Sequence, residues 1–267
     1  MTFLPRAVKL VARAADTVRT PARGLVVLIY HRVGAHTPVV VDLPTPDFDD
    51  QMTLLADTGM VLPLDDAVTR LAAGEDLSGH VAVTFDDGTA DFVDEAVPVL
   101  ARTMVPATLY VATRHIEDGI DFPDDGRPAS WSALADSVTT GLVTIGSHTH
   151  SHALLDRLPA DEIADELDRS IDLIGNRLQV AAQHFAYPKA LAPSGPADRE
   201  VRKRFTSAAL AGTRANSAGT DVHRLLRSPV QTTDGDRWFR QKMVGGMGFE
   251  DDIRRMVNRR RYQGASA

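Results

Sequence analysis

Short apolar runs alternate with amphipathic stretches from residue 25 to residue 230. Several of the runs are continuously hydrophobic and rich in Val, Ile and Leu, which is typical of strands buried on both faces. We predict strands over residues 25–30, 81–85, 107–112, 143–146, 184–187, 206–210 and 225–230. The sequence therefore predicts a sheet that is covered on both sides.

Apolar residues recur at spacings of three and four in the stretches between the strands, most clearly over residues 160–178. This spacing is typical of helices with one buried face. We predict helices over residues 47–58, 64–73, 90–103, 130–140, 160–179, 196–205 and 249–261. About seven strand–helix units favour a closed or nearly closed parallel β/α barrel, with a doubly wound open sheet as the alternative. Residues 117–128, rich in Asp, Gly and Pro, are expected to form a long loop.

The two ends of the chain differ from its middle. Residues 1–24 predict an amphipathic helix, and charged side chains interrupt every stretch where the apolar core of a secretory signal would lie. We expect this helix to pack on the domain, with peripheral contact of residues 1–23 with an anionic membrane as the alternative. Residues 251–267 hold five arginines and predict a basic helix followed by a tail.

Composition narrows the class of protein. The chain has 267 residues, a net charge of −7, 43% apolar residues and no cysteine. The apolar content excludes a disordered chain, and the acidity argues against a nucleic-acid partner. Without cysteine there are no disulfides, thiolate metal sites or cysteine nucleophiles. No run of about 18 apolar residues predicts a membrane span, and we expect a cytoplasmic protein.

Polar side chains follow several of the predicted strands. His31 follows the first strand, Asp86 and Asp87 follow the second, and residues 148–152 hold three histidines directly after the fourth. In a parallel barrel the carboxyl ends of the strands meet at one rim, where active sites lie. We therefore expect these side chains to gather in one place.

Asp86, Asp87 and Gly88 leave their strand in sequence. Adjacent residues point in different directions, so the two carboxylates are expected to have different tasks. One can bind a metal while the other faces substrate or water, and Gly88 permits a sharp turn. The alternative is that an aspartate caps a helix that begins near residue 90.

His148, His150 and His152 are spaced by two residues. On a helix His148 and His152 would share a face, and on an extended segment all three would. Either arrangement can present imidazoles to one ion, and a catalytic zinc site suits two histidines and a carboxylate. The alternative is a polar surface loop. No glycine-rich phosphate loop and no serine-hydrolase elbow is present in the sequence.

The motifs together resemble those of a known family. Residues 84–88 (TFDDG) and 148–152 (HTHSH) are similar to the first two motifs of the polysaccharide deacetylases, the NodB-homology domain of carbohydrate esterase family 4. Residues 30–33 (YHRV) and 185–188 (FAYP) resemble a subgroup of that family. The resemblance spans about residues 25–230.

The resemblance implies a distorted (β/α)7 barrel over residues 25–250 that hydrolyses acetamides on the amino sugars of an acetylated glycan. It implies that Asp86 is the general base. It implies that Asp87, His148 and His152 hold a divalent ion, with zinc as the first choice. The ion would polarise the acetyl carbonyl, and the backbone N–H of Lys189 would meet the oxyanion.

The chain departs from the family pattern at two points. Ala186 stands where many members have an arginine that holds the base, and the late Leu-x-His motif with the acid histidine is absent near residues 225–227. We take His31 as the candidate general acid, with His150 and His223 as weaker ones. The altered third motif and the lack of an evident export signal leave room for removal of O-acetyl or N-acyl groups from a smaller or lipid-linked glycan. A non-catalytic carbohydrate-binding barrel is a further hypothesis, and a glycoside hydrolase is a more distant one.

Overall fold

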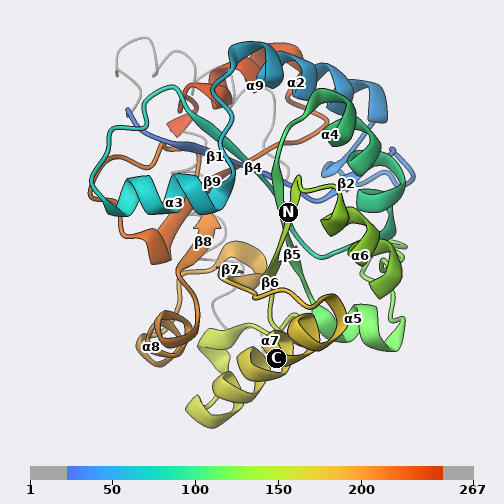
Figure 1. Cartoon of the computed structure of the whole chain (residues 1–267), viewed down its shortest axis with the longest axis vertical. Helices are drawn as coiled ribbons and strands as arrows, with labels where there is room; N and C mark the ends of the chain where they lie inside the picture. Colours follow the sequence, from blue (N-terminus) through green and yellow to red (C-terminus); the bar gives the residue numbers. More distant parts are fainter. Residues whose placement is uncertain (1–22, 249–267) are drawn as a thin grey trace.

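The computed structural model describes residues 23–248, in which seven strands form one closed parallel barrel (Figure 1). In barrel order the strands are β1 (Val26–Tyr30), β4 (Val81–Phe85), β5 (Ala107–Val111), β6 (Val143–Ser147), β7 (His184–Ala186), β8 (Ser207–Ala211) and β9 (Leu225–Pro229). The first and last strands pair in parallel, with Val27 opposite Arg227. The predicted β/α barrel is confirmed, and this pairing excludes the open sheet.

Helices surround the barrel on its outside (Figure 1). They are α2 (Thr45–Thr58), α3 (Leu64–Ala72), α4 (Val97–Thr103), α5 (Thr113–Asp118), α6 (Trp131–Thr139), α7 (Ala160–Leu178), α8 (Gly195–Arg204) and α9 (Gly235–Met243). The longest, α7, buries Ile163, Leu167, Ile174 and Leu178 at the helical spacing that the sequence predicts. The apolar face of α7 thus packs against the rest of the protein.

Every predicted strand begins and ends within one residue of an observed one, but some elements were missed. The short pair β2 (Arg32–Val33) and β3 (Asp42–Leu43), helix α5 and helix α9 were not predicted. Helix α9 buries only Phe239 and Lys242, which is too few apolar positions to show a period. The predicted helix 249–261 and the terminal segments 1–24 and 251–267 lie outside the described residues, apart from residues 23 and 24.

Two kinds of packing fill the molecule. Between β1, β4 and the outer helices, the rings of Tyr30, Phe48 and Phe85 lie 5.3–5.7 Å apart. A second contact is between Tyr110 of β5 and Arg227 of β9, two large side chains that are each 0% exposed. The Arg227 guanidinium carbon lies 5.0 Å from the Tyr110 ring centroid. A buried cation in the barrel needs a counter-charge, which the site supplies.

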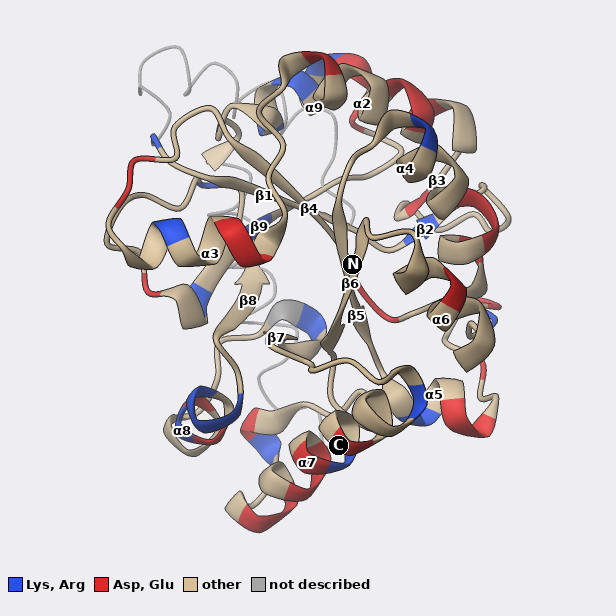
Figure 2. Ribbon diagram, in the orientation of Figure 1, with Lys and Arg blue, Asp and Glu red and all other residues tan. Residues whose placement is uncertain are grey.

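Charged side chains lie mainly on the outer helices (Figure 2). Where α7 and α8 face one another, Arg204 donates to Asp168 at 2.6 and 2.8 Å. Within residues 23–248, none of the helices combines the length and the apolar character that a membrane crossing would require.

Candidate active site and metal centre

The carboxyl end of the barrel collects the polar residues that follow the strands. Asp86 and Asp87 come directly after β4, and His148 comes directly after β6. Asp87 has a backbone φ of 75° and Gly88 one of 96°. A non-glycine residue with positive φ is uncommon and favoured in turns by Asp and Asn. This turn leaves each carboxylate facing a different set of partners, and neither aspartate caps the next helix, which begins at Phe92.

Asp86 faces into the barrel and is held by an arginine. Arg227 Nη1 donates to Asp86 Oδ1 at 2.5 Å and Nη2 donates to Asp86 Oδ2 at 2.9 Å. The arginine is 0% exposed and the aspartate 4%. Burial acts to raise the pKa of Asp86, but the charges of Arg227 and then His148 outweigh it and lower this pKa to about 2. Asp86 is therefore an ionised, oriented carboxylate in a buried setting.

Asp87 lies beside two histidines, with Oδ1 3.6 Å from His148 Nε2 and 3.5 Å from His152 Nε2. His148 Nε2 is also 3.8 Å from Asp86 Oδ2, so it lies between the two carboxylates. One potential ligand atom from each of the three residues lies within 4.8 Å of the others. One carboxylate and two imidazoles in such a cluster match the donor set of a catalytic zinc site, which also keeps a position for water or substrate. These residues therefore fit a divalent ion.

The orientation of His148 supports this interpretation of the cluster. Its Nδ1 is 2.8 Å from the Ala186 carbonyl oxygen at the end of β7. A carbonyl can only accept, so Nδ1 carries the proton and Nε2 presents a lone pair toward Asp87. A histidine that binds a metal is commonly oriented by such a bond from its second nitrogen.

The segment that holds the histidines is neither a helix nor an extended strand. Thr149 and His152 both have positive φ values, 67° and 62°. This irregular path brings His148 and His152 together, with ring centroids 4.9 Å apart. His150 points elsewhere, because its Nδ1 contacts Thr113 Oγ1 at 3.0 Å. His150 is therefore not part of the cluster.

Electrostatics keep Asp87 and His152 in the protonation states that bind cations. Burial, together with the charge of His148, lowers the pKa of His152 to about 3. Burial acts to raise the pKa of Asp87, but the charges of His152, His31 and His148 reverse this and leave it below its usual value. Neutral imidazoles beside an ionised carboxylate are the forms that ligate metals.

His31 lies at the same end of the barrel, next to both aspartates. Burial lowers its pKa, while the charges of Asp87 and Asp86 act in the opposite direction. Its Nδ1 is buried and has no hydrogen-bond partner among residues 23–248. A polar atom left without a partner in a buried position calls for an explanation, and a substrate atom is one.

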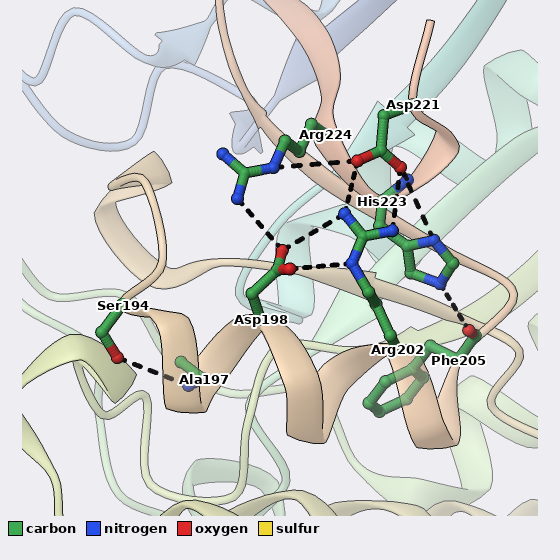
Figure 3. Close-up of polar contacts among 8 residues, drawn as sticks. All are labelled: Ser194, Ala197, Asp198, Arg202, Phe205, Asp221, His223 and Arg224. Atoms are coloured by element: carbon green, nitrogen blue, oxygen red, sulfur yellow. Dashed lines mark hydrogen bonds and ion pairs between the residues drawn. The ribbon is translucent and has the colours of Figure 1, made fainter.

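The two remaining candidate site residues, Lys189 and His223, lie at opposite ends of the barrel. Lys189 follows β7, is exposed and has a φ of 56°, and its charge contributes to the lowered pKa of His152. His223 lies away from the site, beside the amino-terminal start of β9, where its Nε2 contacts the Phe205 carbonyl oxygen at 2.8 Å (Figure 3). It belongs there to a surface network around Asp221. His223 is therefore too far from the reacting groups to serve as their acid.

Arg227 is the residue that the sequence analysis missed. The arginine that is absent from the position of Ala186 has a counterpart on another strand, β9, where Arg227 reaches Asp86. One signal was present: a lone charged residue in the otherwise uncharged run over residues 225–230. A charge in a strand buried on both faces needs a buried partner, and Asp86 is that partner.

Comparisons with known proteins agree with this geometry. A sequence model described as polysaccharide deacetylase matches residues 73–209, just over half of the chain. A chitin deacetylase of Arthroderma benhamiae is 29% identical over 117 residues, which cover 42% of this chain and 29% of that protein. The Bacillus subtilis protein YxkH is 26% identical over 170 residues, which cover 63% of this chain and 57% of that protein. The chain thus spans less than two thirds of the length of either relative.

Solved structures show the same fold. The Streptococcus pyogenes deacetylase PplD in complex with acetate matches with a TM-score of 0.74 at 21% identity, covering 84% of this chain and 99% of that one. The structure of IcaB from Ammonifex degensii matches with a TM-score of 0.72 at 23% identity, covering 84% of this chain and 98% of that one. At these identities the likeness concerns the barrel itself.

Proposed function

Because the chain belongs to the polysaccharide deacetylase family, we propose that it is a metal-dependent hydrolase that removes acetyl groups from N-acetylated amino sugars of a poly- or oligosaccharide. The observation that carries the proposal is that the two aspartates have different main partners. Asp86 is held by Arg227, whereas Asp87 faces His148 and His152. A base beside a candidate ion site is the arrangement that hydrolysis of an acetamide requires.

Asp87, His148 and His152 would hold the divalent ion, with zinc as the first choice. When bound, such an ion supplies a Lewis acid that polarises the acetyl carbonyl. Asp86 accepts the proton of the attacking water at a carboxylate oxygen, and Arg227 keeps that carboxylate ionised and correctly oriented. The Lys189 backbone N–H serves as a donor to the oxygen on which negative charge develops.

The leaving amine needs a proton, and His31 is the group we assign to supply it. It is within the electrostatic reach of both aspartates, and it has a ring nitrogen free of protein partners among the described residues. General acid catalysis by a positioned histidine matches this placement. The reaction then releases acetate and a free amino sugar.

The test is acetate release by the full-length chain loaded with zinc. With oligomers of N-acetylglucosamine, we expect acetate and new free amine in equal amounts, both abolished by a chelator and restored by zinc. An O-acetylated glycan of similar length serves as the comparison substrate. Release of acetate from it alone would assign the chain to O-deacetylation. Release from neither, by a protein that binds zinc, would favour a carbohydrate-binding role.

A further inference from the structure

The ring of His152 is surrounded by two other rings from one short stretch of chain. His115 and Phe122 are stacked on each other, with centroids 4.0 Å apart and planes 12° from parallel. Both meet His152 edge to face, at centroid distances of 6.4 and 6.5 Å and angles of 87° and 89°. Edge-to-face packing within about 7 Å is a favoured and oriented aromatic contact. The plane of the His152 ring is thus defined by its neighbours.

The two candidate histidine ligands are oriented by different means. His148 donates from Nδ1 to the Ala186 carbonyl oxygen. For His152, no hydrogen bond from either ring nitrogen is present among residues 23–248, and its backbone has the left-handed φ of 62°. An imidazole ligand without an orienting hydrogen bond can rotate about its side-chain bonds unless packing prevents it. The stacked rings of His115 and Phe122 provide the packing that limits this rotation of His152.

Local hydrogen bonds hold both members of the stacked pair. His115 lies on α5, and its Nδ1 is 2.9 Å from the Ile120 carbonyl oxygen. Phe122 is 3% exposed and is bound to Gly126 by two backbone hydrogen bonds of 2.8 and 3.2 Å. The loop they form leaves little freedom to the Phe122 ring.

A buried arginine fixes this loop from the side of the first strand. Arg32 of β2, 7% exposed, donates to the carbonyl oxygens of Asp124 and Pro123 at 2.6 and 2.5 Å. A Cβ at Gly126 would lie 2.1 Å from Arg32 Nη2, so a larger residue there would displace the guanidinium from this position. The loop is therefore anchored to the same strand end that carries His31.

We propose that His115 and Phe122 are positioning residues that set the ring plane of His152 and so raise the affinity of the metal centre. The proposal rests on the proposed function, since it assumes that His152 is a ligand. It assigns a task to helix α5 and the loop that follows it, which the chemistry at Asp86 does not use; the structure begins this loop at residue 119, because the predicted loop residues 117 and 118 belong to α5.

Cobalt titration of the metal-free, full-length protein tests the proposal, because Co²⁺ reports its ligand geometry in its visible spectrum. Phe122→Leu and His115→Leu remove a ring and keep an apolar side chain. We expect each to weaken Co²⁺ binding about tenfold and to change the spectrum, as changes beside metal ligands do. His115→Phe keeps the stack without a ligating nitrogen and should bind as the wild type does. Ile120→Ala, on an exposed side chain of the same loop, is the matched control.

Unchanged affinity and spectrum in both leucine variants would overturn the proposal. Equal losses in His115→Phe and His115→Leu would also overturn it, because His115 would then act through its nitrogen. If the wild type binds no metal, the proposed function fails. NMR relaxation of the His152 ring then tests separately whether His115 and Phe122 position that ring. A ring as rigid in Phe122→Leu as in the wild type would then refute the positioning role, and a ring released in that variant would support it.

Discussion

The two ends of the barrel both place a histidine beside an aspartate. At the amino-terminal end, His184 at the start of β7 contacts Asp65 Oδ1 through Nε2 at 2.7 Å and Ser207 Oγ through Nδ1 at 2.8 Å. At the carboxyl end, the Nε2 atoms of His148 and His152 stay 3.6 and 3.5 Å from one oxygen of Asp87. The residue types are the same, but the distances are not.

The difference in distance separates a cluster whose ring nitrogens all have hydrogen-bond partners from one whose ligand atoms do not bond one another. Each ring nitrogen of His184 has a partner at ordinary hydrogen-bond length, so the cluster needs nothing further. The atoms around Asp87 converge on a shared point without bonding one another at that length. Convergence without direct bonding is the geometry expected of residues that enclose an ion. In this protein, the His–Asp cluster with unused lone pairs is therefore the candidate for metal binding, and the pair of His184 and Asp65 is not.

Removing a candidate ligand gives the largest expected contrast between the two ends. His148→Ala should abolish metal binding and activity, because a three-residue site loses one of its donors. His184→Ala is the matched control and should keep both. It should cost about 1–3 kcal/mol of unfolding free energy, since Asp65 and Ser207 lose their partner. Metal content by emission spectrometry and thermal unfolding measure the two effects, and loss of metal in His184→Ala would contradict the contrast.

Replacing the two aspartates separates base from ligand within the carboxyl end. Asp86→Asn should keep the metal and lower kcat/KM by about 10²–10⁴-fold, the usual contribution of a general base. Asp87→Asn should lose the metal. Thermal unfolding is measured alongside, because Arg227 loses its buried counter-charge in Asp86→Asn. Equal loss of metal in both variants would show that Asp86 is itself a ligand.

Replacing His31, at the carboxyl end of the barrel, should have a smaller effect on turnover. His31→Gln should lower turnover about 10²-fold, at the lower end for general acid catalysis, with metal content near that of the wild type. A glutamine keeps a polar side chain of similar length but cannot protonate the leaving amine. Turnover equal to the wild type across pH 5–9 would remove His31 from the mechanism.

The smallest expected effect concerns Arg227, which holds the Asp86 carboxylate. Arg227→Lys keeps the charge, loses the two-pronged contact and should lower kcat/KM about tenfold. Arg227→Met removes the charge that lowers the pKa of Asp86, so Asp86 is protonated at higher pH and the acidic limb of the pH–rate profile moves upward. We expect Arg227→Met to lower the free energy of unfolding by about 3–5 kcal/mol. If Arg227→Met does not fold, the activity of Arg227→Lys still tests the role of the two-pronged contact. An acidic limb unmoved in a folded Arg227→Met would show that Asp86 is not the titrating base.

The strands and the candidate chemistry were predictable because both are local. Continuous apolar runs mark strands buried on both faces, and in a parallel barrel each run ends at the rim where function gathers. Asp86 with Asp87, and His148 with His152, lie so close in sequence that spacing alone suggests a shared site. The path between the two histidines was not predictable, since positive φ values at Thr149 and His152 depend on their surroundings.

Local sequence patterns specify the elements and the residue types at their ends, because burial of a helix face or a strand imposes a periodic pattern on the chain. The tertiary structure alone decided which partners meet. Asp86 and Arg227 are 141 positions apart and join only because β1 pairs with both β4 and β9 when the barrel closes. Phe122 reaches His152 through a loop that has no periodic pattern. Contacts of this kind follow from closure and loop packing, which no local pattern encodes.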